Sequence, residues 1–284
     1  MIDHQYINLC RKLVQEGTWI HNERTGKKCL TLKKAIFEYN PVMSEDGAYF
    51  NNLPMDTTRQ SFWKSAVAEL LGYLRGYDNA YDFVALGTKT WLANASSPSW
   101  TSNPHYRGDG DMGKCYGVIG HDFGGVNQFT KVYENLKMGI DDRGEIITFW
   151  KPDDFDKACL RPCMYQHHFS LIQKDLSLIS YQRSCDVPLG LNFNMIQVFV
   201  FLCLMARITG NKPTEATHII VNPHIYEDQY DTMLIQIQRE PMDLPILWIN
   251  PRIKDWDDVL KCNTDDFDVI CYQSHGPLKY PMSV

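Results

Sequence analysis

The chain has 284 residues, of which 44% are hydrophobic and 22% are charged. This composition supports a substantial core and excludes a disordered or low-complexity chain. The formal net charge of −6, from 34 acidic and 28 basic residues, argues against a surface built broadly for nucleic acid, so we expect a few local arginines to meet any bound phosphate.

Nine cysteines are an odd number for a disulfide framework. The opening MIDHQYINLC also lacks the basic and then apolar pattern of a secretory signal. We therefore expect reduced thiols and a cytoplasmic location, and one of the thiols is a candidate nucleophile.

Apolar residues at helical spacing predict a first helix over about 3–16 and a second over about 60–75, which Gly76 ends. Glu69 lies in the middle of the second helix, and is either a surface residue at the edge of the apolar stripe or a buried functional group. The segment 96–113 is rich in Ser, Asn, Pro, Gly and Asp, which predicts a long loop or insertion.

From residue 145 the pattern changes to strands, which are predicted at EIITFW, YQHHFSLI and LSLISYQRSCDV, with a turn at 173–175. A buried helix is predicted over about 194–208, and its apolar run is shorter than the roughly 20 residues that a membrane span needs. Later strands are predicted at THIIVN and LPILWI. Helices and strands do not alternate regularly and no linker divides the chain, so we expect one α+β domain over 1–284 with a mixed sheet flanked by helices.

Several of the candidate functional residues lie in two segments, Arg161-Pro162-Cys163 and the run YQRSCDVPLGLNFN at 181–194. With ERTG at 23–26, HIY at 224–226 and the C-terminal PMSV, their order and spacing strongly resemble the thymidylate synthase family over nearly the whole chain. The resemblance implies a homodimer packed sheet to sheet. It also implies transfer of a one-carbon unit from 5,10-methylenetetrahydrofolate to deoxyuridylate, without a metal, a membrane or a nucleic acid.

Cys163 is the candidate nucleophile. A pyrimidine ring is electron-poor at C6, and addition of a thiolate there turns C5 into a carbon that attacks a one-carbon donor. A nearby arginine such as Arg183 would lower the thiol pKa. The competing interpretation is an inert buried cysteine, which we keep for the other eight.

Zinc binding is a second use of this segment, because Cys159, Cys163, His167 and His168 are close in sequence. However, only one Cys-x3-Cys pair is present. The two adjacent histidines also fall on a predicted strand, where they would point to opposite faces. We therefore expect no metal.

Phosphate recognition is predicted for Arg24, Arg183 and Ser184, because guanidinium groups bind phosphate oxygens in pairs and a hydroxyl adds a further bond. In the resembled family two adjacent arginines reach across the dimer interface to this phosphate. Here the pair reads Arg143-Gly144, so either Arg143 acts alone or Arg161 takes over part of the role.

Asn194 is predicted to read the base, because an amide offers an N–H to the uracil O4 and an oxygen to the uracil N3–H. Cytosine presents the reverse pattern, so deoxyuridylate is favoured over deoxycytidylate. A helix N-cap is the alternative role for this residue. His224 and Tyr226 are two positions apart, so in an extended segment they would face one side and hold the sugar 3′-hydroxyl, unless they are a surface pair.

The resemblance also implies which residues bind the folate. It implies that Asp186 contacts the pterin ring, that Trp91 packs against the folate, and that Gly190 and Val284 help to bind it, with Val284 closing over the site as a lid. Catalytic roles are implied for Glu69, which would order water for proton transfer, and for Tyr116, near the C5 proton.

The chain departs from the family around these positions. Gly72 stands where a bulky aromatic is usual, Leu92 where an acid is usual, and Met164 where a histidine usually follows the nucleophile. The segment around Tyr116 keeps Gly113 and Gly117 but loses a proline and a tryptophan-arginine pair. The residues expected to bind the nucleotide match the family pattern better than those expected to bind the folate.

Three functions fit these observations. The first is a thymidylate synthase. The second is a deoxyuridylate hydroxymethylase, in which water in place of hydride attacks the transferred carbon. The third is a silent relative that binds a nucleotide or RNA as a regulator, and the intact Cys163, Arg183, Asp186 and Asn194 weigh against it.

Overall fold

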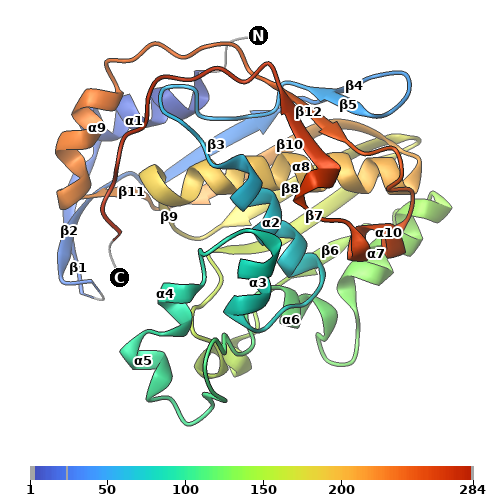
Figure 1. Cartoon of the computed structure of the whole chain (residues 1–284), viewed down its shortest axis with the longest axis horizontal. Coiled ribbons are helices and arrows are strands. Elements are labelled where there is room, and N and C mark those ends of the chain that lie inside the picture. The colour runs from blue at the N-terminus through green and yellow to red at the C-terminus, as the bar shows by residue number, and fades with distance from the viewer. Residues whose placement is uncertain (1–3, 24, 283–284) are drawn as a thin grey trace.

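A five-stranded mixed sheet lies at the centre of the computed structural model, which describes residues 4–23 and 25–282 (Figure 1). The strand order is β3-β10-β8-β7-β6. Strands β10 and β8 are parallel, and the other neighbours are antiparallel. The strands are β3 (Lys34–Tyr39), β10 (Lys212–Val221), β8 (Asp175–Gln182), β7 (Met164–Ile172) and β6 (Ile146–Thr148).

Two four-stranded sheets complete the β structure of the described residues. The first consists, in order, of β1 (Thr18–Asn22), β2 (Lys27–Thr31), β11 (Pro223–Tyr226) and β9 (Cys185–Asp186). The second consists of β13 (Phe267–Ile270), β12 (Ile246–Ile249), β5 (Tyr49–Asn51) and β4 (Val42–Met43).

Helix α8 (Asn192–Thr209) forms the axis of the core, and 15 of its 18 residues are buried. It is apolar all round, which requires burial on every side, and it packs between the central sheet and α2 (Trp63–Leu74). The apolar helical segment is longer than predicted. By length and composition Val187–Thr209 would suffice to cross a membrane, but 78% of its most apolar window is buried inside the fold. It is a core helix.

The remaining helices surround this core (Figure 1). They are α1 (Gln5–Glu16), α3 (Ala80–Leu86), α4 (Leu92–Ala95), α5 (Pro98–Thr101), α6 (Gly117–His121), α7 (Gln128–Met138), α9 (Tyr230–Gln236) and α10 (Trp256–Lys261). Short 3-10 turns occur at Pro152–Lys157, Glu227–Gln229 and Thr264–Asp266, and a π turn at Val187–Leu191 leads into α8. The predicted α+β class, with a mixed sheet flanked by helices, is confirmed.

Two predicted elements differ from the structure. Helix α2 begins at Trp63, after the predicted start. Ser61 lies outside the helix, where its N–H donates to the Tyr272 hydroxyl at 2.8 Å. The predicted strand LSLISYQRSCDV is two strands in two sheets. The chain leaves the central sheet after Gln182 and joins the first four-stranded sheet as β9, beside β11.

The segment 96–113, predicted as a loop, contains α5 and is anchored to the rest of the fold. Trp100 is 2% exposed, and its indole N–H donates to the Asp111 carbonyl at 2.7 Å. The Arg107 guanidinium pairs with the carboxylates of Asp111 and Asp78. These contacts hold the segment as a packed lobe below α3 and α4 (Figure 1).

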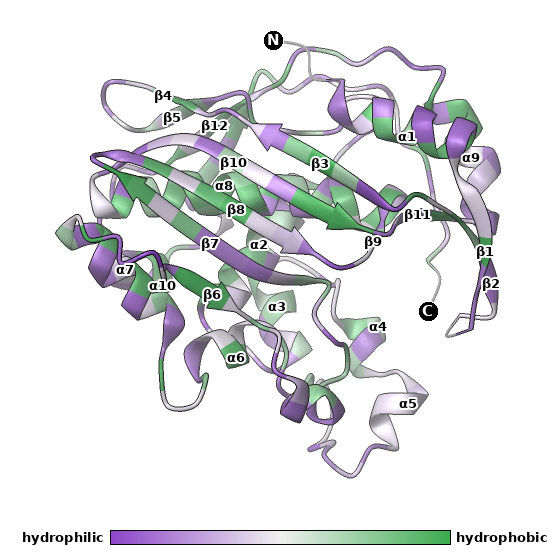
Figure 2. Cartoon of the chain, turned by 180° about the vertical axis from the view of Figure 1, so that it is seen from behind, coloured by the Kyte–Doolittle hydropathy of each residue, from purple (hydrophilic) through white to green (hydrophobic). Residues whose placement is uncertain are grey.

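One face of the central sheet carries no helix within the described chain (Figure 2). Alternate residues along the strands point toward α8 and are buried, as in β8, where Leu176, Leu178 and Ser180 are buried. Their neighbours on the opposite face are exposed or half-buried, and include Ile36, Ile179, Tyr181 and Ile219. Apolar side chains thus stand on a face of the sheet that no helix of the described chain covers.

The aromatic side chain missing at Gly72 is supplied by another helix. Phe83 of α3 is fully buried, and a Cβ built on Gly72 would lie 2.2 Å from its Cε1 atom. The ring therefore occupies the space that a side chain at position 72 would need.

We predict that Gly72→Ala destabilises the protein. The clash with Phe83 should outweigh the better helix propensity of alanine and lower the free energy of unfolding by about 1–3 kcal/mol, as overpacking does. Urea unfolding measures this. Gly276→Ala is the matched control, because a Cβ there meets nothing within 4 Å. Equal or greater stability of Gly72→Ala would contradict the placement of Phe83.

Candidate functional site

The register of β7 and β8 creates the site. The two strands are antiparallel and pair Met164 with Gln182, so the residues just before β7 and just after β8 lie side by side. The Arg183 backbone N–H donates to the Cys163 carbonyl at 2.9 Å. The proposed nucleophile and the arginine are thus neighbours through sheet pairing.

The Arg183 side chain turns toward the Cys163 thiol. Its Nε donates to the Pro162 carbonyl at 2.9 Å and its Nη2 to the Arg161 carbonyl at 3.1 Å. The same Nη2 lies 3.8 Å from the Cys163 sulfur. A fixed positive charge at this distance favours the thiolate, which is the nucleophilic form of cysteine.

Tyr116 supports the nucleophile from the other side. The Cys163 backbone N–H donates to the Tyr116 hydroxyl at 2.8 Å. The phenol ring stacks on Tyr73, with centroids 4.7 Å apart, and meets Trp91 edge-on at 5.6 Å. Burial raises the pKa of Tyr116 well above its usual range, and the adjacent Cys163 adds to the effect, so the hydroxyl stays protonated.

The backbone at Tyr116 is strained. Its φ of 34° and ψ of −97° lie outside the regions that a residue with a side chain prefers. The chain then passes close to α2, since a Cβ on Gly117 would lie 2.1 Å from the Tyr73 carbonyl oxygen. Strain of this kind, about 1–3 kcal/mol, persists where the surroundings fix the geometry, which is common at functional sites.

Glu69 is a buried carboxyl group, 8% exposed, so of the two predicted alternatives the surface position is wrong. Thr90 Oγ1 donates to its Oε1 at 2.7 Å, and Gln197 Nε2 donates to its Oε2 at 2.6 Å. Burial raises the pKa of Glu69, and these hydrogen bonds oppose the shift by stabilising the charged form. A carboxyl group with a raised pKa is suited to proton transfer.

Asn194 lies in the first turn of α8, within a chain of amide groups. Its Oδ1 accepts from Gln182 Nε2 at 2.9 Å, and its Nδ2 donates to Gln197 Oε1 at 3.1 Å. It does not cap the helix, which begins at Asn192. Gly190 approaches the same amide, because a Cβ there would lie 3.7 Å from Asn194 Oδ1.

Asp186 lies in β9, at the entrance to the π turn. Its carboxylate accepts from the Leu189 N–H and from Gln229 Nε2, both at 3.1 Å. Burial raises its pKa, although these hydrogen bonds act against the shift. Gln229 Nε2 also donates to the Pro281 carbonyl at 3.0 Å, which ties the C-terminal segment to this carboxylate.

His224 and Tyr226 both lie in β11 and are buried, so the surface-pair alternative is wrong. Their rings meet edge-on with centroids 5.1 Å apart, as expected for two residues on one face of a strand. His224 Nδ1 lies 3.0 Å from the Asn222 carbonyl oxygen, which fixes the ring orientation.

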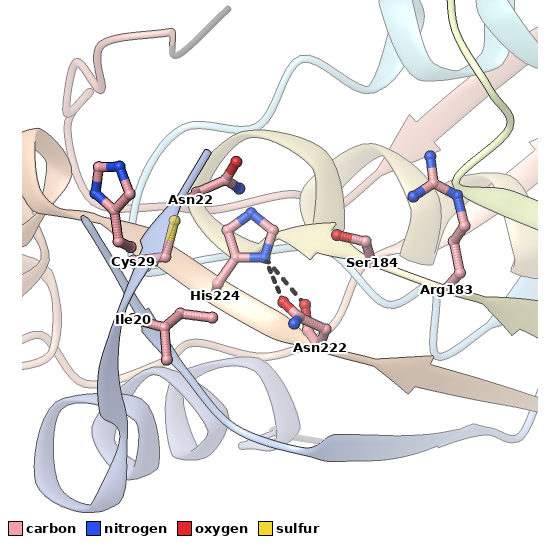
Figure 3. A pocket seen from close by; sticks show the side chains of 8 residues that line it. Ile20, Asn22, Cys29, Arg183, Ser184, Asn222 and His224 are labelled. Atoms are coloured by element: carbon pink, nitrogen blue, oxygen red, sulfur yellow. Dashed lines mark hydrogen bonds between the residues drawn. The ribbon is translucent and has the colours of Figure 1, made fainter. Parts of the chain in front are cut away.

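A cavity of about 260 Å³ opens between β1, β11 and the end of β8 (Figure 3). Arg183, Ser184 and His224 line it together with Ile20, His21, Asn22, Cys29 and Asn222. The sequence did not point to the last five. Asn22 immediately precedes the ERTG motif and Asn222 lies just before HIY, so their positions next to those motifs could have marked them as site residues. Nothing in the sequence around Cys29 marks it in this way.

The other predicted residues either fall outside the described ranges or do not line this cavity. Trp91 is 3% exposed and packs behind Tyr116. Arg143 lies on an exposed loop before β6 and does not line the cavity. Arg24 and Val284 fall outside the described residues. His167 is buried and His168 is half-buried, as expected for opposite strand faces, and no three potential metal ligands gather among the residues described.

Comparisons with known proteins agree with the motif order. The family model described as thymidylate synthase matches residues 4–284. A curated thymidylate synthase of Haemophilus influenzae (strain PittEE) is 57% identical over 288 residues, covering 99% of each chain. Those of Aliivibrio fischeri (strain ATCC 700601 / ES114) and Vibrio vulnificus (strain YJ016) are 54% identical with the same coverage.

We predict a pH-dependent stability to which His218, beneath the site, contributes. Burial, with a smaller effect of His167, lowers the pKa of His218 to about 3. The unfolded chain binds this proton near pH 6.5, so the free energy of unfolding falls as the pH drops from about 6.5 toward 3, by about 2 kcal/mol at pH 5.

Urea unfolding at pH 7 and pH 5 tests this. His218→Gln should lose about 2 kcal/mol of the wild-type pH dependence. His105→Gln, at an exposed position, is the control and should keep it. A His218→Gln variant with the full wild-type pH dependence would show that His218 does not contribute.

Proposed function

The chain belongs to the thymidylate synthase family, and from this membership we propose that it methylates deoxyuridylate at C5. The co-substrate 5,10-methylenetetrahydrofolate supplies the one-carbon unit and the hydride, and the products are thymidylate and dihydrofolate. The observation that carries the proposal is the Cys163 sulfur 3.8 Å from Arg183 Nη2. Arg183 also lines the cavity of about 260 Å³.

Cys163 is the nucleophile of this mechanism. Its thiolate adds to C6 of the uracil ring, which gives C5 the character of an enolate carbon. After the carbon transfer and reduction at C5, the C6–S bond breaks and the thiolate is regenerated. Arg183 stabilises the thiolate before the addition and after the release.

Phosphate and sugar bind in the described cavity. Arg183 and Ser184 contribute a charge and a hydroxyl to the phosphate, joined by Arg24. His224 and Tyr226 hold the 3′-hydroxyl from one face of β11. Their fixed ring geometry, with centroids 5.1 Å apart, supports a preorganised sugar site.

Proton transfer at C5 falls to Tyr116 and to water ordered by Glu69. The Tyr116 hydroxyl is held by the Cys163 N–H, so it lies beside the carbon that follows C6 in the bound ring. Glu69 lies behind the base, where its raised pKa suits exchange of a proton with water.

The residues on the folate side fit a flat, polar ring. The absence of a Cβ at Gly190 leaves room beside Asn194. Asp186 uses one oxygen for Leu189 and the other for Gln229, and the remaining lone pairs can accept N–H groups of a pterin. Trp91 forms an apolar wall behind Tyr116. The bond from Gln229 to the Pro281 carbonyl holds the described part of the C-terminal segment near Asp186, which supports the closing role proposed for this segment.

A homodimer would cover the uncovered face of the central sheet. Ile36, Ile179, Tyr181 and Ile219 lie on that face, and a second copy packed against it would remove them from water. Arg143 of the partner subunit would then reach the phosphate.

No disulfide joins the cysteines within the described chain, which agrees with a cytoplasmic location.

Incubation with deoxyuridylate and methylenetetrahydrofolate tests the function. The synthase gives a methylated product and an equal amount of dihydrofolate, followed by its absorbance. A hydroxymethylated product without dihydrofolate would identify the hydroxymethylase instead. If no product forms, the result would favour the third function, a protein that binds a nucleotide without catalysis.

We predict that Cys163→Ala abolishes turnover while deoxyuridylate still binds, because only the covalent step needs the sulfur. Isothermal titration calorimetry measures the binding. Cys271→Ala is the control, since Cys271 is exposed and lies outside the site, and it should keep full activity. Retained turnover in Cys163→Ala would exclude Cys163 as the nucleophile.

We predict that Gly144→Arg tightens deoxyuridylate binding about three- to tenfold by adding a charged phosphate contact across the dimer interface. The new Cβ would meet Asp142 Oδ1 at 2.9 Å, at the end of an exposed side chain that accepts from the Gly144 N–H and from Lys131, and a small shift of this carboxylate should accommodate it. Gly276→Arg adds the same charge elsewhere and should not change the dissociation constant. An unchanged or weaker affinity of Gly144→Arg would argue against this position of Arg143.

A further inference from the structure

The direction of the Asn194 amide decides which base the site accepts, and the inference below rests on the proposed base-reading role of that residue. The oxygen and the NH2 group of an amide have nearly the same shape, so the side chain fits its space equally well after a half-turn. One direction complements uracil and the other complements cytosine. Something in the fold must therefore select the direction.

Gln182 fixes the direction from the sheet side. Its Nε2 donates to the Ser184 carbonyl at 3.1 Å and to Asn194 Oδ1 at 2.9 Å. A backbone carbonyl only accepts hydrogen bonds, so Gln182 must keep its NH2 group toward Ser184. Asn194 must then present its oxygen to Gln182.

The contacts of the Gln182 amide oxygen are consistent with this orientation. Its Oε1 lies 2.8 Å from His218 Nε2, and His218 Nδ1 lies 3.2 Å from the Tyr39 hydroxyl. A neutral His218 with its proton on Nε2 donates to Gln182 and accepts from Tyr39. Every group in this branch of the network then has a complementary partner.

Gln197 fixes the direction from the helix side. Its Nε2 donates to the Ala66 carbonyl at 3.3 Å and to Glu69 Oε2 at 2.6 Å. Its Oε1 accordingly faces Asn194, whose Nδ2 donates to it at 3.1 Å. The Ala66 carbonyl, like that of Ser184, cannot donate, so the two ends of the chain impose the same direction on Asn194.

We propose that Gln182 and Gln197 are specificity-determining positioning residues, through which two backbone carbonyls orient Asn194 to accept uracil and reject cytosine. Half of the hydrogen-bonding capacity of Asn194 is used by the two glutamines. One oxygen lone pair remains for the uracil N3–H and one N–H remains for O4. Cytosine would place a lone pair against the amide oxygen and an amino group against the amide NH2.

A half-turn of Asn194 would break both glutamine bonds and oppose like groups at each contact. The oxygen of Asn194 would face Gln197 Oε1, and its NH2 group would face Gln182 Nε2. Specificity thus has an attractive part toward uracil and a repulsive part toward cytosine. Neither glutamine needs to touch the substrate for this effect.

Binding measurements with Gln182→Met, Gln197→Met and the double variant test the proposal. Methionine has a similar length and cannot fix an amide direction. The measured quantity is the ratio of the dissociation constants for deoxycytidylate and deoxyuridylate. We expect each single variant to lower this ratio about 3- to 10-fold and the double variant about 10- to 100-fold, because each removes one anchoring hydrogen bond.

Two controls distinguish a lost orientation of the Asn194 amide from a general loss of binding or stability. Deoxyribose 5-phosphate lacks a base, so its affinity should change less than twofold in the same variants. Gln128→Met removes another buried glutamine, whose amide bonds the Ile119 and Thr148 carbonyls and the Thr148 N–H outside the site. It should keep the wild-type ratio even if it is less stable.

Serine variants keep the proposal testable if the methionine variants do not fold. Water would fill the space left by Gln182→Ser or Gln197→Ser. Because water donates and accepts equally well, it satisfies Asn194 without directing it, and the ratio should fall as with methionine. An unchanged ratio in all of these variants would overturn the proposal. A wild-type protein that binds both nucleotides equally would overturn the base-reading role of Asn194 itself.

Discussion

The antiparallel pairing of β7 with β8 is the constraint on which the site depends. It places Cys163, just before one strand, beside Arg183, just after the other. The chain then leaves the central sheet and pairs with β11, which brings Asp186 and His224 to the same end of the fold. Nucleophile, charge and sugar-binding residues are therefore positioned by backbone hydrogen bonds, with little dependence on flexible loops.

Polar side chains lie behind this sheet end, inside a largely apolar core. Glu69, Gln197, Asn194, Gln182 and His218 follow one another by hydrogen bonds of 2.6–3.1 Å. An unsatisfied buried amide costs about 1–3 kcal/mol, so the row is stable only when each member has its partner. Satisfied in this way, the row favours a single arrangement of the site, because each amide is held by hydrogen bonds on both sides.

Much of the fold and of the candidate site could be predicted from local patterns. Helix α1 follows from apolar periodicity and α8 from a continuous apolar run, and Cys163, Arg183 and Asn194 stand out because their motifs are continuous in sequence. The split of LSLISYQRSCDV between two sheets was not visible, because it depends on pairing with the distant β11. Gln182 and Gln197 also gave no signal, since a glutamine in an apolar run does not reveal its partners before the chain is folded.

The strained backbone of Tyr116 has a consequence for the order of folding. A φ of 34° at a residue with a side chain is unfavourable in the free chain, and it is offset here by the Cys163 N–H and by stacking on Tyr73. Cys163 directly precedes β7 and Tyr73 belongs to α2, so these partners meet only after the central sheet and α2 have packed together. Tyr116 should therefore reach its native conformation late, and catalytic activity should appear after most secondary structure has formed, as a sensitive indicator of the completed fold.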